Sequence, residues 1–581
     1  MARQLERFDN LVALFLTRAE EKGDVPFLWA KPEDEWLAVS WSEAARQVAA
    51  LAASLKRLGL EPGDRVALVS ENRPEWLIAD LAIMAAGCVT VPTYTTNTTR
   101  DHTHILENSG ARAVIVSNQK LAKALVPAVL TSNDCHHLIG IEDIRVDQTP
   151  DWVTVHRWSE LTGGEADVEA VRRDIARIGR NDLACIIYTS GTGGAPRGVR
   201  QHHGAILHNV EGCTDIISTD FGWGDEVFLS FLPASHAYEH SGGQHFPIGL
   251  GAQIYYAESL EKLAANIEEV HPTIMVVVPR LFELLRTRIM KAIEGGGGLS
   301  KYLLHRALKI GGDKYHGRFK PWDLPMDGIL SLSLRRKVRA KVGGRVKAWV
   351  SGGAPLNPEV GNFFQSLGIT FLQGYGQTES GPVISCNRPS VGIRPDTVGV
   401  PVKNTEVRIA EDGEIMVRGE NVMHGYWRNA EETARVLRDG WLGTGDVGHF
   451  DAKGRIVITD RKKDIIVNDK GDNVSPQRIE GILTLQGEIA QAMVYGDRKP
   501  HLVALLVPDP EIASAPDLQK QLQASVDRVN ADLSVIERIR RFIVADAPFA
   551  IENEQLTPSM KIRRHIIGKA YGERLEALYK R

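Results

Sequence analysis

Apolar residues in the first part of the chain alternate between short continuous runs and stretches with helical spacing. The runs at 65–70, 111–117 and 183–189 are rich in Val, Ile and Leu and predict buried strands. Between them, the stretch 74–87 has the length and the apolar spacing of a helix. Strands that alternate with helices indicate parallel sheets covered by helices, so the predicted fold class is α/β.

The texture of the sequence changes near residues 440–475, where turn dipeptides separate short β-rich runs. The charged triplet 461–463 lies between two of these runs. A solvated hairpin turn is one interpretation. A linker fits better, because a mixed α/β pattern restarts at Pro476 and continues for about 100 residues more. We therefore predict a large N-terminal domain over 1–462 and a small α+β C-terminal domain over 463–581.

Composition and charge narrow the class of protein. A chain of 581 residues is too long to fold around a single hydrophobic core. The net charge of −4, from 69 basic and 73 acidic residues, argues against a nucleic-acid partner. The cysteines are scattered without a CxxC pair, which favours a reduced, cytoplasmic chain without a zinc knuckle. The first residues lack a signal-peptide core, and no apolar run is long enough to predict a membrane span.

A basic stretch follows four consecutive glycines at 295–298, and we expect an insertion over 295–345. Residues 301–347 contain 13 Lys or Arg and only 3 Asp, with aromatic residues interleaved. One interpretation is a solvated helical excursion on the surface. The other is a patch that faces anionic lipid or a phosphate-bearing ligand, which would place the protein peripherally at the inner face of a membrane.

A loop rich in glycine and hydroxyl groups, YTSGTGGAPRGV, occupies 188–199 at the end of a predicted strand. Glycine tolerates the backbone angles that turn successive N–H groups inward, and such nests bind phosphate. Arg197 adds a permanent charge with two parallel donors. We expect polyphosphate to be held by the loop residues Thr189, Ser190, Gly191, Thr192, Gly193, Gly194 and Arg197.

Three known phosphate loops compete for this stretch, beside a purely structural turn. The dinucleotide fingerprint GxGxxG fails, because Pro196 stands at its last glycine. The P-loop fails, because Val199 and Arg200 follow where Lys and Ser or Thr are needed. The loop of adenylate-forming enzymes, YTSGTTGxPKGV, agrees at ten of twelve positions. Gly193 and Arg197 are the departures, and we expect them to alter the KM for ATP while activity is retained.

Further motifs extend this resemblance over roughly residues 40–565. In order, they are LPASHAYEH (232–240), VSGGAPL (350–356), LQGYGQTES (372–380), GTGDVG (443–448), DRKKDIIV (460–467) and LTPSMKIRR (556–564). The chain resembles the AMP-forming acyl-CoA synthetases of the adenylate-forming superfamily, in the long-chain fatty-acid branch. The resemblance implies a helix-covered N-terminal domain with the adenylate-forming fold and a mobile C-terminal domain.

The resemblance also implies a nucleotide site. Its adenine segments are Gly352, Gly353, Ala354, Gln373, Gly374, Tyr375 and Gly376. The ring of Tyr375 can stack on a base, Thr378 can donate to the α-phosphate, and Glu379 can hold Mg²⁺. A solvated loop acid is the alternative interpretation of Glu379. Gln377 stands where the branch usually has an apolar residue, so we expect different packing there.

Four more roles follow from matching positions. Asp446 has two oxygens for the two ribose hydroxyls, and Arg461 approaches the ribose from the other side. His236 corresponds to the histidine near the acyl carboxylate, although a lone histidine after a strand is otherwise more often structural. Lys463 corresponds to the pivot between the domains. Lys561 corresponds to the catalytic lysine, although a lysine in a basic tail is otherwise a solvated charge.

The implied reaction uses ATP, Mg²⁺ and coenzyme A with small-molecule substrates only. A fatty acid, expected to be long-chain, becomes an acyl-adenylate and then an acyl-CoA. Four alternatives stay open. They are a fatty acyl-AMP ligase that loads a carrier protein, a CoA ligase for a medium-chain or aryl acid, an adenylation module of a peptide synthetase, and a non-catalytic nucleotide-binding regulator. The sequence neither requires nor excludes an oligomer.

Overall fold

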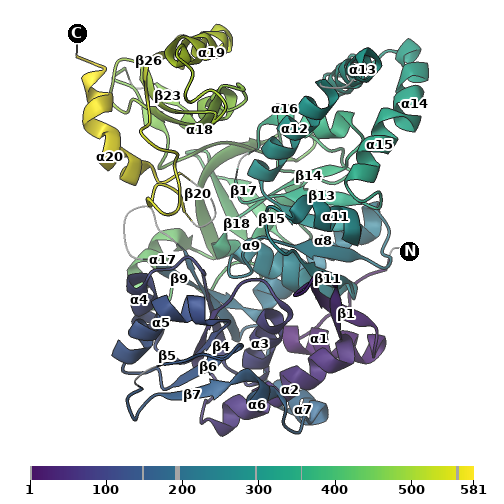
Figure 1. Ribbon diagram of the computed structural model, residues 1–581, viewed down its shortest axis with the longest axis vertical. Coiled ribbons are helices and arrows are strands. Elements are labelled where there is room, and N and C mark those ends of the chain that lie inside the picture. Colours follow the sequence, from purple (N-terminus) through teal and green to yellow (C-terminus); the bar gives the residue numbers. More distant parts are fainter. Residues whose placement is uncertain are drawn as a thin grey trace.

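Two large β-sheets with helices on their faces make up most of the molecule, and three smaller sheets lie beyond them (Figure 1). The computed structural model describes residues 3–146, 149–189, 196–294, 297–354, 356–470, 472–557 and 562–580. Most large-sheet strands are parallel and connected through helices, so the predicted α/β class is confirmed.

The seven-stranded sheet contains the strand that leads into the glycine-rich loop. Its order is β7-β6-β5-β3-β4-β8-β9, parallel throughout except for the antiparallel pair β8–β9. The strands are β3 Arg65–Val69, β4 Val89–Thr93, β5 Ala111–Val116, β6 His137–Gly140, β7 Thr154–Arg157, β8 Leu183–Thr189 and β9 Arg197–His202. β8 and β9, which flank the glycine-rich loop in sequence, thus lie at one edge of this sheet.

The nine-stranded sheet supplies the central walls of the molecule. Its order is β16-β15-β14-β13-β12-β10-β11-β1-β2. The strands are β1 Pro26–Ala30, β2 Leu37–Ser40, β10 Val227–Ser230, β11 Gln253–Tyr256, β12 Ile274–Val277, β13 Ala348–Ser351, β14 Phe371–Gly376, β15 Val383–Cys386 and β16 Val400–Pro401. The parallel centre of the sheet is a near-continuous apolar surface, as expected of strands covered on both faces.

Helices from the first half of the chain fill the space between the two large sheets. They include α1 Leu11–Lys22, α2 Trp41–Arg57, α3 Pro74–Ala85, α7 Val168–Ile175 and α8 His203–Asp220. Asn10 and Ser40 accept from backbone N–H groups of the first turns of α1 and α2, which fixes where these helices begin. Phe27 of β1 stacks on Trp41 of α2 with ring centroids 3.5 Å apart. Burial of two such rings stabilises the fold by several kcal/mol, at about 2–3 kcal/mol each.

Other helices cover the outer faces of these sheets or link their strands. They are α4 Thr99–Ser109, α5 Gln119–Thr131, α6 Trp158–Thr162, α11 Leu263–Val270, α12 Pro279–Glu294 and α16 Pro358–Ser366. The short segments α9 Ala237–Glu239, a π-helix His240–His245 and α10 Phe246–Leu250 run on from one another. They are buried against β10 and β12, close to the centre of the molecule.

The basic segment forms helices that project from one side of the molecule (Figure 1). These are α13 Gly298–Tyr315, α14 Leu324–Leu332 and α15 Leu334–Lys341. One face of α13 packs on α16, so closely that a Cβ on Gly311 would lie 1.7 Å from Oγ of Ser366. The same projection carries large apolar residues in solvent, namely Leu299, Tyr302, Trp322, Leu324, Ile329 and Leu332.

A five-stranded sheet follows, and a C-terminal unit with its own core comes last. The sheet consists of β17 Glu406–Ile409, β18 Glu414–Arg418, β19 Leu437–Arg438, β20 Trp441–Phe450 and β21 Ile456–Arg461, with α17 Ala430–Val436 beside it. Beyond it lie β22 Ile466–Val467, β23 Asn473–Val474, α18 Pro476–Leu483, β24 Ile489–Tyr495, β25 Leu502–Pro508, α19 Leu518–Asp532, β26 Ile539–Val544 and α20 Arg564–Ala577. Apolar clusters pack on both faces of the sheet β24-β25-β26. Among the described residues, no helix is long and apolar enough to cross a membrane.

Candidate active site

A cavity of about 870 Å³ lies where the nine-stranded sheet, the five-stranded sheet and the C-terminal unit meet. Its volume is within the range of small-molecule sites. Of the residues that the sequence assigned to a site, twelve line this cavity, namely Thr189, Arg197, His236, Gly352, Gly353, Gly374, Tyr375, Gly376, Thr378, Glu379, Arg461 and Lys463. Segments far apart in the chain therefore converge on one space.

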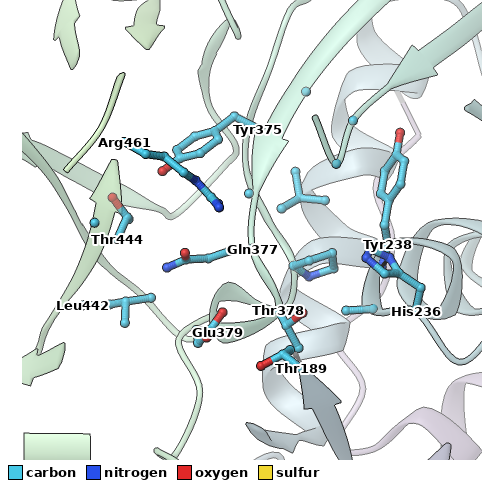
Figure 2. Close-up of a pocket in the computed structure, with 18 of the residues that line it drawn as sticks. Thr189, His236, Tyr238, Tyr375, Gln377, Thr378, Glu379, Leu442, Thr444 and Arg461 are labelled. Carbon is cyan, nitrogen blue, oxygen red and sulfur yellow. Dashed lines mark hydrogen bonds between the residues drawn. The ribbon is translucent and has the colours of Figure 1, made fainter. Parts of the chain in front are cut away.

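One wall carries Tyr375 beside Arg461 (Figure 2). Tyr375 lies near the end of β14, and its hydroxyl donates to Oδ2 of Asp446 at 2.7 Å. Nε of Arg461 donates to Oδ1 of the same carboxylate at 2.9 Å, across the β20–β21 ladder. The carboxylate of Asp446 raises the pKa of Arg461, and burial raises that of Tyr375. Asp446 thus lies behind the wall, with a protein donor on each oxygen.

Thr378 and Glu379 follow β14 in a 3₁₀ turn, Thr378–Ser380 (Figure 2). Gly376 is required before it, because a Cβ there would lie 1.9 Å from the carbonyl oxygen of Pro382. Oε1 of Glu379 accepts a hydrogen bond from the Tyr426 hydroxyl at 2.8 Å. Burial raises the pKa of Tyr426, and the Glu379 carboxylate adds to that effect. Tyr426 is a lining residue that no sequence motif singled out.

The cation predicted at the glycine-rich loop has protein partners. Arg197, at the start of β9, forms an ion pair with Glu432 on α17. Its guanidinium lies 5.8 Å from the ring centroid of Tyr426. Glu432 also accepts from Arg435 at 2.5 Å, and all four side chains line the cavity. Glu432 and Arg435 were not predicted, because nothing in their spacing relates them to a residue more than 200 positions earlier.

His236 begins the buried segment that forms the opposite wall (Figure 2). Its Nδ1 accepts from the backbone N–H of Tyr238 at 3.2 Å, and the Tyr238 hydroxyl donates to the carbonyl of Val350 at 2.8 Å. The segment continues through the π-helix, where Gly242 lines the cavity. π-Helical turns are rare, but those that occur are often found at functional sites.

The cavity continues from these polar residues into an apolar end between α8 and the nine-stranded sheet. Its lining there consists of Cys213, Ile216, Ile217, Phe246, Ile274, Val276, Val350, Leu372 and Cys386. Burial raises the pKa of Cys213 to about 12 and raises that of Cys386 as well. Both thiols are therefore neutral, and this end of the cavity offers only uncharged surface.

Some predicted residues lie elsewhere. Ala354 is exposed and does not line the cavity, and Gln373 is buried behind it, where its carbonyl accepts from the backbone of Asn387 at 2.9 Å. By contrast, a Cβ on Gly353 would meet no atom within 4 Å, so open space lies next to this backbone. Ser190, Gly191, Thr192, Gly193, Gly194 and Lys561 lie outside the described residues.

The C-terminal unit contributes to the same cavity. Thr557 and residues 562–565 line it from that side, and in the sequence they flank residues 558–561, which include Lys561. Lys463 lies in the turn that follows β21 and also lines the cavity. The two flanks of the predicted C-terminal motif and the predicted pivot therefore face the same space as Tyr375 and Glu379.

The donor set fits magnesium at one position. Glu379 supplies a hard carboxylate oxygen on the cavity wall, and the neighbouring Thr378 also lines the cavity. Mg²⁺ prefers such oxygens, keeps several waters, and commonly needs only one or two carboxylates beside substrate phosphates. The residues present therefore suit the ion.

Comparison with known proteins decides the family. The profile of the AMP-binding enzymes matches residues 15–427, and that of the AMP-binding enzyme C-terminal domain matches residues 463–581. The chain belongs to the AMP-binding enzyme family. The two matches leave residues 428–462 between them, and the second begins at Lys463, within the motif DRKKDIIV (460–467).

Whole-length relatives within this AMP-binding family are known. The chain is 32% identical to the long-chain-fatty-acid–CoA ligase FadD15 of Mycobacterium tuberculosis, over 98% of this chain and 97% of that protein. It is 28% identical to the long-chain-fatty-acid–[acyl-carrier-protein] ligase AEE15 of Arabidopsis thaliana, over 97% and 86%. Its fold resembles the adenylation domain of a carboxylate reductase from Mycobacterium chelonae, with a TM-score of 0.76, 23% identity, and 99% and 92% coverage. The predicted adenylate-forming fold is thus confirmed.

Proposed function

We propose that this protein activates a long-chain fatty acid with ATP and transfers the acyl group to coenzyme A, producing acyl-CoA, AMP and pyrophosphate. One observation carries the proposal. One cavity has a polar end, lined by Arg197, Glu379 and Arg461, that continues into an uncharged end beside α8. The first end suits a nucleotide and the second an alkyl chain. The whole-length relationship to a long-chain-fatty-acid–CoA ligase supports the same reaction.

In the first half-reaction, an oxygen of the fatty-acid carboxylate attacks the α-phosphorus of ATP. The bond between this phosphorus and the bridging oxygen breaks, and pyrophosphate leaves with that electron pair. The carboxylate is already ionised at neutral pH, so no protein base is needed. The barrier comes mainly from charge repulsion and positioning, which the fixed cations of the cavity reduce.

In the second half-reaction, the thiol sulfur of coenzyme A attacks the acyl carbonyl carbon. The thioester bond forms, the bond from carbon to the phosphate oxygen breaks, and AMP leaves, while the thiol proton passes to solvent. We propose that residues 463–581 turn about Lys463 between the two half-reactions. That motion takes Lys561 away from the nucleotide and opens a path for the thiol.

Each predicted residue has a proposed role within this scheme. The loop 189–194 and Arg197 hold the β- and γ-phosphates. The segments 352–354 and 373–376 form the adenine side, with Tyr375 as the stacking ring. Asp446 and Arg461 bind the ribose, Thr378 donates to the α-phosphate, His236 lies near the acyl carboxylate, and Lys561 neutralises the charge that develops at the α-phosphoryl oxygens. The carboxylate of Glu379 would hold Mg²⁺, which when bound neutralises phosphate charge.

One assay set tests the proposal. ATP–pyrophosphate exchange and AMP release are measured with long-chain, medium-chain and aryl acids, with and without coenzyme A. We expect acid-dependent exchange, and AMP release that requires coenzyme A and is fastest with long-chain acids. A preference for aryl or medium-chain acids would assign another substrate. The absence of any acid-dependent signal would favour a nucleotide-binding regulator.

A second acceptor is favoured by one specific observation. The relative from Arabidopsis thaliana acts, by its name, on an acyl carrier protein, and it matches nearly the whole chain. The same assay with a phosphopantetheinylated carrier protein in place of coenzyme A separates the two acceptors. Acyl transfer to the carrier alone would replace coenzyme A as the acceptor in this proposal.

We further propose that the projecting helices α13–α15 contact an anionic membrane surface. Apolar side chains such as Trp322 and Leu332 are 72% and 80% exposed there. Lys301, Lys320, Arg336 and Lys337 are exposed on the same projection. Cations together with exposed apolar side chains suit the interface of an anionic bilayer.

Vesicle flotation tests the contact. We expect the protein to float with phosphatidylglycerol vesicles, to float less with phosphatidylcholine vesicles, and to lose binding in a Trp322→Ser/Leu332→Ser variant. Leu260→Ser is the matched control, since Leu260 is 69% exposed and lies outside the helices α13–α15. Equal flotation of all variants, or of a protein that lacks residues 301–345, would contradict the proposal.

A further inference from the structure

Glu432 joins two arginines at the polar end of the cavity. One of its oxygens, Oε1, accepts from Nη1 of Arg197 and from Nη2 of Arg435. The Glu432 side chain is only 14% exposed, whereas that of Arg435 is 54% exposed and faces solvent. The three side chains line the cavity and carry a net charge of +1 by their formal charges.

Further contacts hold Glu432 and Arg197 in this arrangement. The backbone N–H of Glu432 donates to Asn429 Oδ1 at 3.1 Å, which fixes the first turn of α17. Tyr426 lies beside the Arg197 guanidinium and connects it to Glu379 through a 2.8 Å hydrogen bond. The position of Arg197 is therefore set on one side by a carboxylate and on the other by an aromatic ring.

A carboxylate between two guanidinium groups occupies a place where a phosphate group binds equally well. Arginine has five N–H donors in a planar fork, and it recognises carboxylates and phosphates in the same bidentate way. An anion that enters this end of the cavity must share these donors with Glu432 or displace it. The negative charge of Glu432 opposes that entry in either case.

We infer that Glu432 is an internal competitor for the cations that receive the β- and γ-phosphates, and that Arg435 is the second of these cations beside Arg197. This inference rests on the proposed function, because it takes ATP as the substrate. It assigns Arg435 to polyphosphate binding, and it makes Glu432 a residue that positions the two arginines. It also gives the enzyme a means to release pyrophosphate, since the carboxylate returns to the guanidinium groups as the product leaves.

Equilibrium binding tests the inference without turnover. ATP, AMP and inorganic pyrophosphate are titrated into the full chain by calorimetry, without acid or thiol. In Glu432→Gln, the neutral amide should tighten ATP and pyrophosphate roughly three- to tenfold at low salt. In Arg435→Gln, the same two ligands should weaken by about the same factor. AMP, which lacks the β- and γ-phosphates, should change by less than about twofold in both variants.

Glu431→Gln is the matched control. Glu431 lies in the same first turn of α17, carries the same charge and is exposed, and it does not line the cavity. It should leave all three affinities unchanged. If Glu431→Gln tightens ATP as much as Glu432→Gln, the effect is one of overall charge and the inference is wrong.

The remaining outcomes are also decisive. Weaker or unchanged binding of ATP and pyrophosphate in Glu432→Gln overturns the competitor role. Equal losses for AMP and ATP in Arg435→Gln indicate a merely structural role and overturn the assignment of that cation. Acid-dependent AMP formation by the wild type reports separately on the proposed function, so a failure of either claim is recognised by itself. A wild type that binds neither ATP nor pyrophosphate would overturn both.

Discussion

Asp80 on α3 accepts a hydrogen bond from Nε2 of His240 at 2.9 Å, and neither side chain is exposed to solvent. His245 donates to the same oxygen at 3.1 Å. Both distances are typical of hydrogen bonds. The Nδ1 atoms of both rings lack a hydrogen-bond partner among the described residues, whereas a metal-bound histidine usually donates its second ring N–H to a partner. The carboxylate thus ties both ends of the π-helix, on the wall of the cavity, to a helix of the neighbouring layer.

Asp80→Asn should destabilise the protein by about 1.5–3 kcal/mol, because an amide oxygen is a weaker acceptor than a carboxylate for the two buried imidazole N–H groups. The π-helix should also move, so the KM for the fatty acid should rise more than the KM for ATP. Denaturant unfolding and a kcat and KM analysis for both substrates check these results. Asp143→Asn, which breaks an exposed ion pair with Arg157, is the control and should change stability by less than about 1 kcal/mol. A loss no larger than that of the control would show that Asp80 does not support this wall.

Glu239 makes stability depend on pH. Burial raises its pKa from 4.5 to about 8, while Ser230 and Gln244 hydrogen-bond to it. Between these two pH values the folded chain keeps a proton that the unfolded chain releases. The contribution of this group is therefore greatest below pH 4.5 and declines as the pH rises toward 8.

Glu239→Gln should remove that decline, since the amide keeps the shape and cannot ionise. The free energy of unfolding, measured by denaturant titration between pH 5 and 8 (roughly the window of the shift), should fall less steeply in the variant than in the wild type. His203, whose pKa is lowered to about 3 mainly by burial, contributes with the opposite sign in both proteins, so only the difference is interpreted. Parallel curves would contradict an uncharged Glu239.

Lys561→Ala separates the two half-reactions. It should lower acyl-adenylate formation by on the order of 10²–10³-fold, through loss of charge stabilisation at the α-phosphoryl oxygens. Thioester formation from supplied acyl-AMP should be unaffected, because in the proposed scheme Lys561 acts only in the first half-reaction. Pyrophosphate exchange and thioester formation are assayed in parallel. Equal losses in both assays would refute the division of labour.

Lys463→Pro tests the pivot. Proline fixes φ near −65° and restricts the residue before it, so the turn after β21 should lose the freedom that domain rotation requires. One half-reaction should survive while overall turnover falls by at least about tenfold. Lys463→Ala, which keeps backbone freedom, is the control for the loss of the side chain. Full overall turnover in the proline variant would place the pivot elsewhere.

Gly242→Val tests the position of the alkyl chain. A Cβ at Gly242 would already lie 3.3 Å from Cγ2 of Val276, so a valine narrows the apolar end. The ratio of kcat/KM for acids of 16 and of 8 carbons should fall by roughly tenfold, with a smaller fall in Gly242→Ala. An equal loss for both acids would indicate general damage to the site. It would argue against placing the alkyl chain in this end of the cavity.

The hydrophobic pattern was sufficient to predict the α/β class, since runs such as 111–117 and 183–189 closely match buried strands β5 and β8. Motif order was sufficient to predict that Tyr375, Glu379 and Arg461 share one cavity. The network of Glu432 with Arg197 could not be predicted, because tertiary contacts across sheets follow no fixed spacing. Nor could the contact of Tyr375 with Asp446, which gives each oxygen of that carboxylate a protein donor before any ligand binds.

The cavity that Tyr375 and Glu379 line from one side is lined by Thr557 and residues 562–565 from the other. A ligand that touches both sides favours the domain orientation in which both are within reach. By thermodynamic reciprocity, that orientation in turn favours the ligand by the same factor. Each nucleotide that binds or leaves would therefore shift the equilibrium between domain orientations. That equilibrium would in turn determine the order in which the substrates bind.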